Sequence, residues 1–336
     1  QPAQAALLSA LGDDDGKVRQ YAAQALSRFG APAVSPLATA LKDKQASTRL
    51  AAAKALNLMA WQNVDLTEAL PALINGLLDD DGAVANSVAN SLNIHRAGPE
   101  TKGSVGKLIE AMKAKDVIVS TTAAVLLGDL GGDAQQAVPA LIEHLADLEK
   151  QMRSAAAKGL GGIGPSARAA VEPLTKLLKD PDPYVRRSAV LALGGIGPDA
   201  GSAVPALREA LKEPEAYIAV AAAAALASIQ PNDAKTMMDY LVKASTDPNH
   251  LTRHVAVEGA GIVGKPAVTL LAERVKDTDE WTRLDAIRVL GKLGPEAREA
   301  VPKLLPALKD PRPFIRRAAL RSLKAIDPNA VPPTGV

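Results

Sequence analysis

Apolar and polar positions along the chain follow two alternating patterns, and both have the period of an α-helix. One type of segment, such as Ala203–Glu213 (AVPALREALKE), is often opened by Val-Pro, and proline is tolerated in the first turn of a helix. The other type, such as Val185–Gly197 (VRRSAVLALGGIG), places small and apolar residues at helical spacing and ends at glycine, which favours a helix C-terminus. No segment shows the alternation expected of a strand. We therefore predict an all-α fold.

The two patterns recur in a fixed frame along the whole chain. Asp180–Pro198 and Asp310–Pro328 both read Asp-Pro-x-Pro, an aromatic residue, a β-branched residue and Arg-Arg, followed by small and apolar positions. An Asp-x5-Arg anchor marks seven units, which carry Asp13 and Arg19, Asp43 and Arg49, Asp147 and Arg153, Asp180 and Arg186, Asp247 and Arg253, Asp277 and Arg283, and Asp310 and Arg316. Three further units keep the frame with changed anchors, at Asp79/Ala85, Ala114/Ser120 and Glu213/Ala219. Self-similarity at a step of about 33 residues predicts a repeat array.

The frame divides the chain into ten two-helix units. Their approximate boundaries are 1–32, 33–65, 66–101, 102–136, 137–170, 171–202, 203–233, 234–265, 266–299 and 300–330, and residues 331–336 (VPPTGV) are expected to form a flexible tail. Two antiparallel helices cannot bury their apolar faces alone, so the units must stack on one another. We predict one domain over 1–330, a right-handed α-solenoid with the first helix of each unit outside and the second lining a concave inner face.

The repeat unit resembles a known family. Its helix pair, its step, the Asp-x5-Arg spacing and the Val-Arg-x-x-Ala-Ala-x-Ala-Leu second helix are similar to HEAT repeats, especially the short bacterial type also found in phycobilisome-lyase-like proteins. The resemblance implies that the fourteen anchor residues form a hydrogen-bond ladder along the stack and are structural. It also implies a binding scaffold, because most members of the family bind other proteins and few are enzymes. A bilin-lyase-like, chromophore-handling protein of the same repeat class remains an alternative.

Composition narrows the classes of function further. Aromatic residues make up only 2% of the chain, so the apolar 47% is mainly Ala, Leu, Val and Ile, which suits closely packed helices. The formal net charge is +2 and gives no global signal for nucleic acid. Cysteine is absent, which excludes disulfides, thiolate metal sites and a cysteine nucleophile. No apolar run approaches the length of a membrane span.

The start of the chain leaves its location open. Residue 1 is Gln rather than Met, which fits a processed or a truncated chain. Both a cytoplasmic and an exported location therefore stay possible readings of a soluble chain. The sequence does not indicate an oligomeric state.

Second-helix residues that face the inner side form the main candidate site. Counting the residue before the anchor arginine as position one, positions three and seven should face inward. They show a basic excess toward the C-terminal half, at Lys158, Arg187, Arg288, Arg317 and Arg321, against one acidic residue, Glu258. A basic groove without aromatic residues would hold an acidic protein or peptide segment. A nucleic-acid backbone is the weaker binding alternative, and the stripe could equally be an ordinary solvated surface, because Lys and Arg are common surface residues.

Two departures from the frame suggest further surfaces. In the third unit, Asn86, Asn90 and Asn93 share one helix face and are followed by His95 and Arg96, although asparagine is a poor helix-interior residue. We interpret this face as a polar contact site, or alternatively as a degraded repeat. It follows an insertion at Ala60–Leu66, which places Trp61 in a linker.

The second departure concerns aromatic residues. Four of them stand two residues before the anchor arginine or its equivalent, at Tyr184, Tyr217, Trp281 and Phe314, with Leu251 interrupting the series. They should form a ridge along one edge, at the starts of the second helices. Each ring would cover a neighbouring turn, or the ridge would be covered by a partner, since Tyr and Trp are favoured interface anchors.

Catalytic or metal chemistry finds little support in the sequence. His250, His254 and Glu258 have helical spacing, but His250 lies in the turn TDPNHL, and two remaining ligands are too few for a metal site. The glycine clusters end helices, whereas a phosphate loop must open one. We therefore predict a non-catalytic, protein-binding HEAT scaffold without a cofactor.

Overall fold

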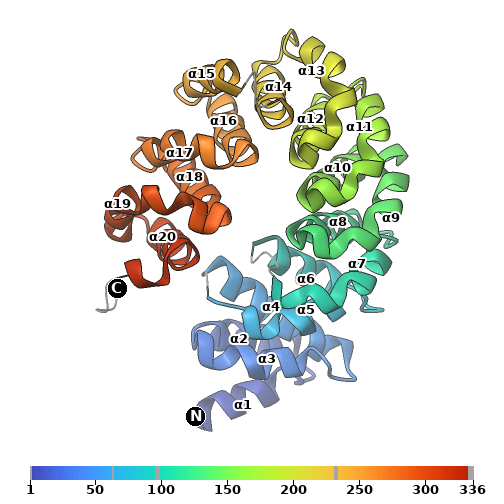
Figure 1. Ribbon diagram of the computed structural model, residues 1–336. Coiled ribbons are helices and arrows are strands. Elements are labelled where there is room, and N and C mark those ends of the chain that lie inside the picture. The colour runs from blue at the N-terminus through green and yellow to red at the C-terminus, as the bar shows by residue number, and fades with distance from the viewer. Residues whose placement is uncertain (1, 63, 95–98, 231–233, 332–336) are drawn as a thin grey trace. The chain divides into compact units, whose positions relative to one another are not determined.

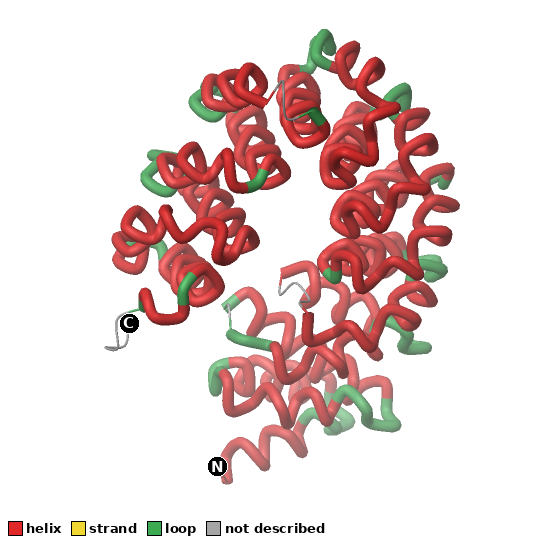
Figure 2. Tube along the Cα trace, viewed as in Figure 1, coloured by secondary structure: helices red, strands yellow, loops and turns green. Residues whose placement is uncertain are grey.

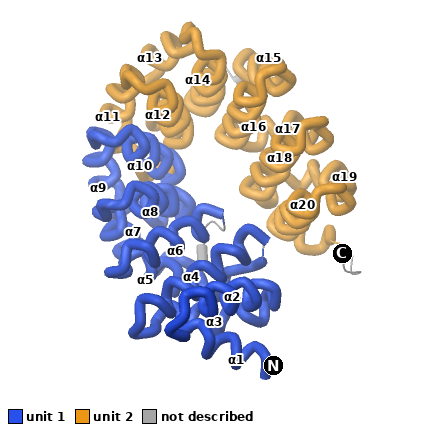
Figure 3. Tube along the Cα trace, turned by 180° about the vertical axis from the view of Figure 1, so that it is seen from behind, with its two compact units in different colours: residues 1–163 blue, residues 164–336 orange. Residues whose placement is uncertain are grey.

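The computed structural model describes residues 2–62, 64–94, 99–230 and 234–331. These residues form helices and loops and include no strand (Figure 2), so the predicted all-α repeat fold is confirmed. The chain divides into two compact units, unit 1 (Gln1–Ile163) and unit 2 (Gly164–Val336) (Figure 3). The expected contacts of His95 and Arg96 and the predicted tail beyond residue 331 lie outside the described residues. The expectation of one continuous domain stays a prediction.

The described residues of unit 1 form five helix pairs (Figure 1). Its first, or A, helices are α1 (Pro2–Ala10), α3 (Val34–Ala40), α5 (Leu70–Gly76), α7 (Val105–Ala111) and α9 (Val138–Glu143). Its second, or B, helices are α2 (Gly16–Ser27), α4 (Ala46–Trp61), α6 (Gly82–Ile94), α8 (Val117–Asp129) and α10 (Lys150–Ile163). Each A helix packs on the B helix that follows it, and each B helix packs on the next B helix of the unit.

Unit 2 repeats this arrangement, with five more pairs among its described residues (Figure 1). The A helices are α11 (Val171–Leu177), α13 (Val204–Ala210), α15 (Ala234–Ala244), α17 (Val268–Arg274) and α19 (Val301–Leu304). The B helices are α12 (Pro183–Ile196), α14 (Ala216–Ile229), α16 (His250–Val263), α18 (Glu280–Leu293) and α20 (Pro313–Ile326). We call the exposed side of each B-helix row the B face of that unit.

The Asp-x5-Arg anchor closes the turn between the two helices of a pair. In all seven complete units the aspartate carboxylate accepts a hydrogen bond from the backbone N–H two residues later. In the same seven units the arginine Nη1 donates to the backbone carbonyl of that aspartate. Some of these arginines also reach the next pair, as Arg49 does with Asp79 at 2.7 Å and Arg283 with Asp310 at 3.0 Å. The spacing therefore serves both the turn and the stack.

Caps at both ends define the B helices. Residues such as Asp116, Asp182 and Asn249 precede the first turn and accept backbone N–H groups that have no partner within the helix. Several helices are followed by a glycine with positive φ, for example Gly197 at 76° and Gly264 at 78°, a conformation that other residues adopt at a cost. These local signals explain why the helix pattern was readable from the sequence.

Small residues allow the B helices to approach closely. Residues Ala221 to Ala225 of α14 are all fully buried, because α14 is covered on every side by its neighbours in unit 2. In unit 1, α8 and α10 touch at glycines, and a Cβ atom added at Gly159 would lie 2.5 Å from the carbonyl oxygen of Ala124. Alanine and glycine thus replace the aromatic residues of an ordinary core.

One stretch of unit 2 has the length and hydropathy of a membrane span, contrary to our sequence prediction. It covers Pro183–Ala210, which comprises α12, a 3-10 segment and α13, and most of its apolar window is buried. The segment is bent at Ala200, where the backbone leaves helical geometry. Buried core helices have the same length and hydropathy, and most of this stretch is buried inside the fold.

Candidate functional site

Three arginines gather on the B face of unit 2. Arg288 on α18 and Arg321 on α20 occupy the same repeat position, α18 packs against α20, and Arg317 lies one turn before Arg321. All three side chains are exposed. Burial and the neighbouring charges of Arg321 and Arg316 lower the pKa of Arg317 below its ordinary value. On this part of the B face the like charges of Arg317, Arg321 and Arg316 therefore repel one another.

Arg187, the fourth arginine predicted for this surface, is used differently. Its side chain is only 11% exposed, and its Nη2 forms an ion pair with Glu258. The two residues belong to α12 and α16, so the ion pair passes over the intervening helix α14. Because the Arg187 side chain is largely buried and its charged end is held by Glu258, we leave Arg187 out of the proposed binding surface.

A histidine, His254, lies next to the glutamate of this ion pair. His254 Nδ1 lies 2.6 Å from Asp285 Oδ2 on α18, and its Nε2 lies 4.0 Å from Glu258 Oε2. The hydrogen bond with Asp285 and the nearby charge of Glu258 raise the pKa of His254, against the opposing effects of partial burial and of Arg187. Within the described ranges, no group of three His, Cys, Asp or Glu side chains could hold a metal ion. Both ring nitrogens instead face carboxylates of this network.

The inward stripe predicted at positions three and seven is interrupted in unit 2. Val220 and Ala224 of α14 are buried, and so are Leu191 of α12 and Leu284 of α18. For these four positions the predicted exposure to a groove is wrong, and on α14 the reason is that its short side chains let α12 and α16 close over it. The Arg187, Glu258, His254 and Asp285 contacts were missed for this reason. The sequence did carry a signal of this burial, because α14 has short side chains at both positions, Val220 and Ala224.

The asparagines of unit 1 split into two groups. Asn86 donates to Asp116, the N-cap of α8, at 3.0 Å, and Asn90 donates to the side chain and the carbonyl of Asn86 at 3.0 Å each. These two amides thus connect α6 with the start of α8. Asn93 is exposed and lies farther along the same helix face.

Asn93 lines a shallow hollow on the B face of unit 1. The hollow has a volume of about 290 Å³, and its walls come from α6, α8 and α10. The lining residues are Asn93, Thr121, Val125, Gln151, Ser154, Ala155 and Lys158. Most of these groups are uncharged and polar, and Lys158 supplies a cation.

Two residues of α4 extend this face and were missed by the sequence analysis. The expectation that Trp61 lies in a linker is wrong, because α4 continues through it, and its side chain is 73% exposed. One turn earlier, the buried Nδ2 of Asn57 has no hydrogen-bond partner among the described residues. The insertion at Ala60–Leu66 interrupts the repeat frame, so the frame did not indicate that α4 ends at Trp61.

The aromatic edge of unit 2 consists of two stacked pairs. Tyr184 and Tyr217 have ring centroids 6.0 Å apart, and Trp281 and Phe314 have centroids 5.7 Å apart, with 18° between the planes in each pair. Tyr184 is 54% and Trp281 57% exposed. Each pair joins two neighbouring B helices at their first turns.

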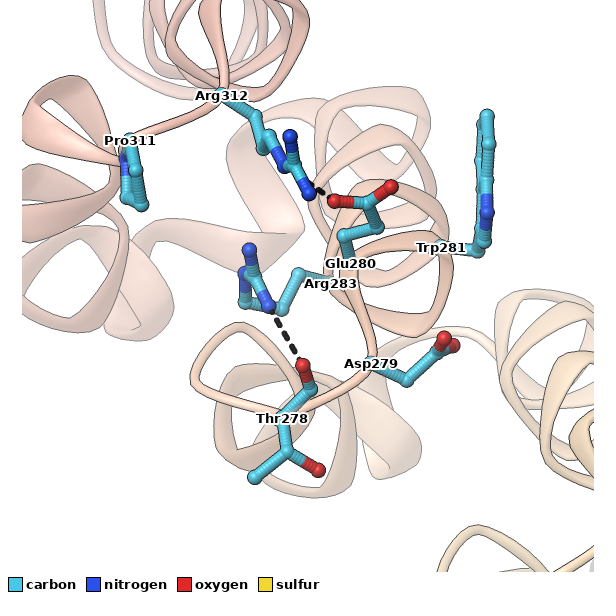
Figure 4. A pocket seen from close by; sticks show the side chains of 7 residues that line it. All are labelled: Thr278, Asp279, Glu280, Trp281, Arg283, Pro311 and Arg312. Atoms are coloured by element: carbon cyan, nitrogen blue, oxygen red, sulfur yellow. Dashed lines mark hydrogen bonds and ion pairs between the residues drawn. The ribbon is translucent and has the colours of Figure 1, made fainter.

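A second hollow, of about 560 Å³, lies beside Trp281 (Figure 4). Its lining residues are Thr278, Asp279, Glu280, Trp281, Arg283, Pro311 and Arg312. Arg312 pairs with Glu280, and Arg283 donates to the carbonyl of Thr278 at 3.1 Å (Figure 4). The charged groups of this hollow largely compensate one another, so it carries no strong preference for a charged ligand.

Comparisons with known proteins agree with this architecture. The family model for HEAT repeats matches residues 5–93, 138–227, 204–291 and 268–334. A crystal structure of an engineered protein is similar with a TM-score of 0.50 and 21% identity over 96% of this chain and 98% of the other. The complex of CpcE and CpcF of phycocyanin lyase from Nostoc sp. PCC7120 is similar with a TM-score of 0.55 and 24% identity over 69% and 92%. None of the curated proteins matches the chain. The two structural similarities concern the fold alone.

Proposed function

The chain belongs to the HEAT-repeat family, and from this premise we propose that it is a non-catalytic scaffold that binds an acidic segment of another protein through the B face of unit 2. HEAT repeats typically mediate protein interactions, which supports the general class of function. The specific surface consists of Arg288, Arg317 and Arg321.

The observation that carries the proposal is the set of exposed like charges on packed neighbouring helices. Burial and the positive charges of Arg321 and Arg316 lower the pKa of Arg317, so like charges repel on α20, and Arg288 lies at the repeat position of Arg321 on the neighbouring helix α18. A carboxylate-bearing partner would relieve this repulsion and form bidentate hydrogen bonds with the planar guanidinium groups. The cluster is a local feature that the formal charge of the whole chain, only +2, does not reveal.

A defined acidic probe tests the proposal. Binding of a fluorescently labelled, glutamate-rich peptide to the full chain is measured by fluorescence anisotropy. We expect the variant R288E/R317E/R321E to weaken binding about tenfold or more, since tenfold corresponds to about 1.4 kcal/mol and three ion pairs are reversed.

A matched variant controls for net charge. Lys265, Lys276 and Lys309 are exposed in the segments that connect the α-helices of unit 2, and their replacement by glutamate changes the total charge by the same amount. We expect this control to bind the peptide nearly as tightly as the wild type does. Equal losses in both triple variants would show that only net charge matters and would overturn the assignment.

Two alternatives have their own signatures in the same assay. A single-stranded oligonucleotide that binds more tightly than the acidic peptide, with affinity falling steeply with salt, would favour nucleic acid. The bilin-lyase-like alternative has the shared fold in its favour, at 24% identity to the phycocyanin lyase complex. Accelerated bilin transfer to an acceptor protein would favour that alternative.

A further inference from the structure

The B face of unit 1 differs in chemistry from the arginine cluster of unit 2. Uncharged amides and hydroxyls predominate along α4, α6, α8 and the start of α10, at Asn57, Asn86, Asn90, Asn93, Thr121, Gln151 and Ser154. A carboxamide contains the same donor and acceptor groups as a peptide bond. Such a face is therefore suited to the main chain of a ligand rather than to one particular charge.

Asn57 adds a hydrogen-bond donor without an acceptor to this face. Its buried Nδ2 has no hydrogen-bond partner within the described part of the chain. Buried polar groups are normally hydrogen-bonded, so an unpartnered donor in a folded protein requires an explanation. A rotation of the amide about its Cβ–Cγ bond would bring this donor to a ligand carbonyl at the surface.

Trp61 supplies an apolar anchor beside the amides. It lies one helical turn after Asn57 on α4, and 73% of its side chain is exposed. Asn93 on α6 occupies the repeat position that Asn57 occupies on α4, and the two helices pack together. Tryptophan is enriched among the residues that dominate binding energy at protein interfaces.

We propose that this face binds an extended peptide segment by its main chain, with one bulky apolar side chain of the segment packed against Trp61. A second side chain enters the hollow of about 290 Å³ between α6, α8 and α10. The binding surface does not involve the arginines of unit 2, so it is a second site of the scaffold. Its failure would leave the first site untouched.

The dimensions and charges of the face define the segment. Neighbouring helix axes lie about 9 Å apart, so the four B helices from α4 to α10 span roughly 27 Å. A strand rises about 3.3 Å per residue, so about eight extended residues cover this distance. Lys54 and Lys158 are exposed, and no acidic residue occupies positions three, seven or ten of these four helices. The segment is accordingly neutral or acidic.

Selection from a displayed library of random peptides about ten residues long tests the proposal. The full wild-type chain serves as bait, and affinities of the enriched peptides are measured by fluorescence anisotropy. We expect enriched peptides to share one bulky apolar residue and to lose affinity when alternate backbone nitrogens are methylated. Failure to enrich any peptide, or indifference to methylation, would overturn main-chain recognition.

Two substitutions with one matched control locate the site. We expect W61A to weaken binding about tenfold. Tyr21 on α2 is a comparable exposed aromatic residue of unit 1, at 66%, and Y21A should change affinity less than about twofold. We further expect N57A to weaken binding while its midpoint of urea unfolding stays unchanged or rises.

The opposite results are equally distinct. Equal effects of W61A and Y21A would remove Trp61 from the site. A lower urea midpoint in N57A, with binding lost in proportion, would assign Asn57 a purely structural role. Loss of peptide binding in R288E/R317E/R321E, with W61A unaffected, would transfer the peptide to the arginine cluster and contradict the second site.

Discussion

Single residues of the unit 2 B face act as one connected group. Arg187, Glu258, His254 and Asp285 link α12, α16 and α18 through an ion pair and a short hydrogen bond. His254 sits between two carboxylates, and its imidazolium form is favoured there. The charged groups that face it are Glu258 on its own helix, Asp285 on α18 and Arg187 on α12. The protonation of one side chain therefore affects contacts among three helices.

This arrangement predicts a pH dependence of stability. The pKa of His254 is raised in the folded chain above its ordinary value of 6.5. Its contribution to folding is therefore complete below that value and is lost as the pH rises through the raised pKa. Because the ring is 41% exposed and solvent screens its charge, we expect a loss of less than about 1 kcal/mol. Urea unfolding at a series of pH values measures it.

The variant D285N serves as the reference for this prediction. It removes the main cause of the raised pKa of His254. We therefore expect D285N to lose little stability as the pH rises above the ordinary pKa of histidine. A wild type and a D285N variant with the same pH profile would contradict the account of this network.

At the scale of helices, close approach depends on residues without large side chains. Glycines of α8 and α10 face each other, and a Cβ atom at Gly162 would lie 2.6 Å from the carbonyl oxygen of Gly128. Backbone atoms cannot move aside as flexible side chains do, so any added atom pushes the two helices apart.

A pair of alanine substitutions of opposite expected sign tests this packing. We expect G159A to lower the free energy of unfolding by about 1–3 kcal/mol, because the new methyl group would meet the carbonyl of Ala124. A Cβ atom added at Gly106 of α7 would meet open space, so G106A should raise stability by up to about 1 kcal/mol through helix propensity. Thermal or urea unfolding measures both. A neutral G159A would mean that α8 and α10 separate without cost.

Helices were more predictable from the sequence than surfaces were. The Asp-x5-Arg turn, the Val-Pro openings and the closing glycines are local signals, and they identified the helix pairs. The end of α4 was missed because the insertion after Ala60 interrupts the frame, although the helix continues to Trp61. The burial of Val220 and Ala224 could not be predicted from the local sequence, because it depends on α12 and α16 closing over α14.

At the scale of the whole molecule, a formal charge of +2 conceals two different B faces. The one in unit 1 is rich in amides and carries an exposed tryptophan, and the one in unit 2 carries exposed arginines. In a repeat protein each pair contacts mainly its neighbours, so surface residues can differ from unit to unit without disturbing the stack. Two sites of different chemistry are therefore compatible with one repeated frame.

The central claim is that the chain is a scaffold whose arginine-bearing B face holds an acidic protein segment. Its most direct test is to cross-link the full chain to a glutamate-rich peptide with a photoreactive group and to map the linked residues by mass spectrometry. The account predicts cross-links on α18 and α20 around Arg288, Arg317 and Arg321, and their loss in R288E/R317E/R321E. Cross-links on the A helices α17 and α19, unchanged in that variant, would contradict it.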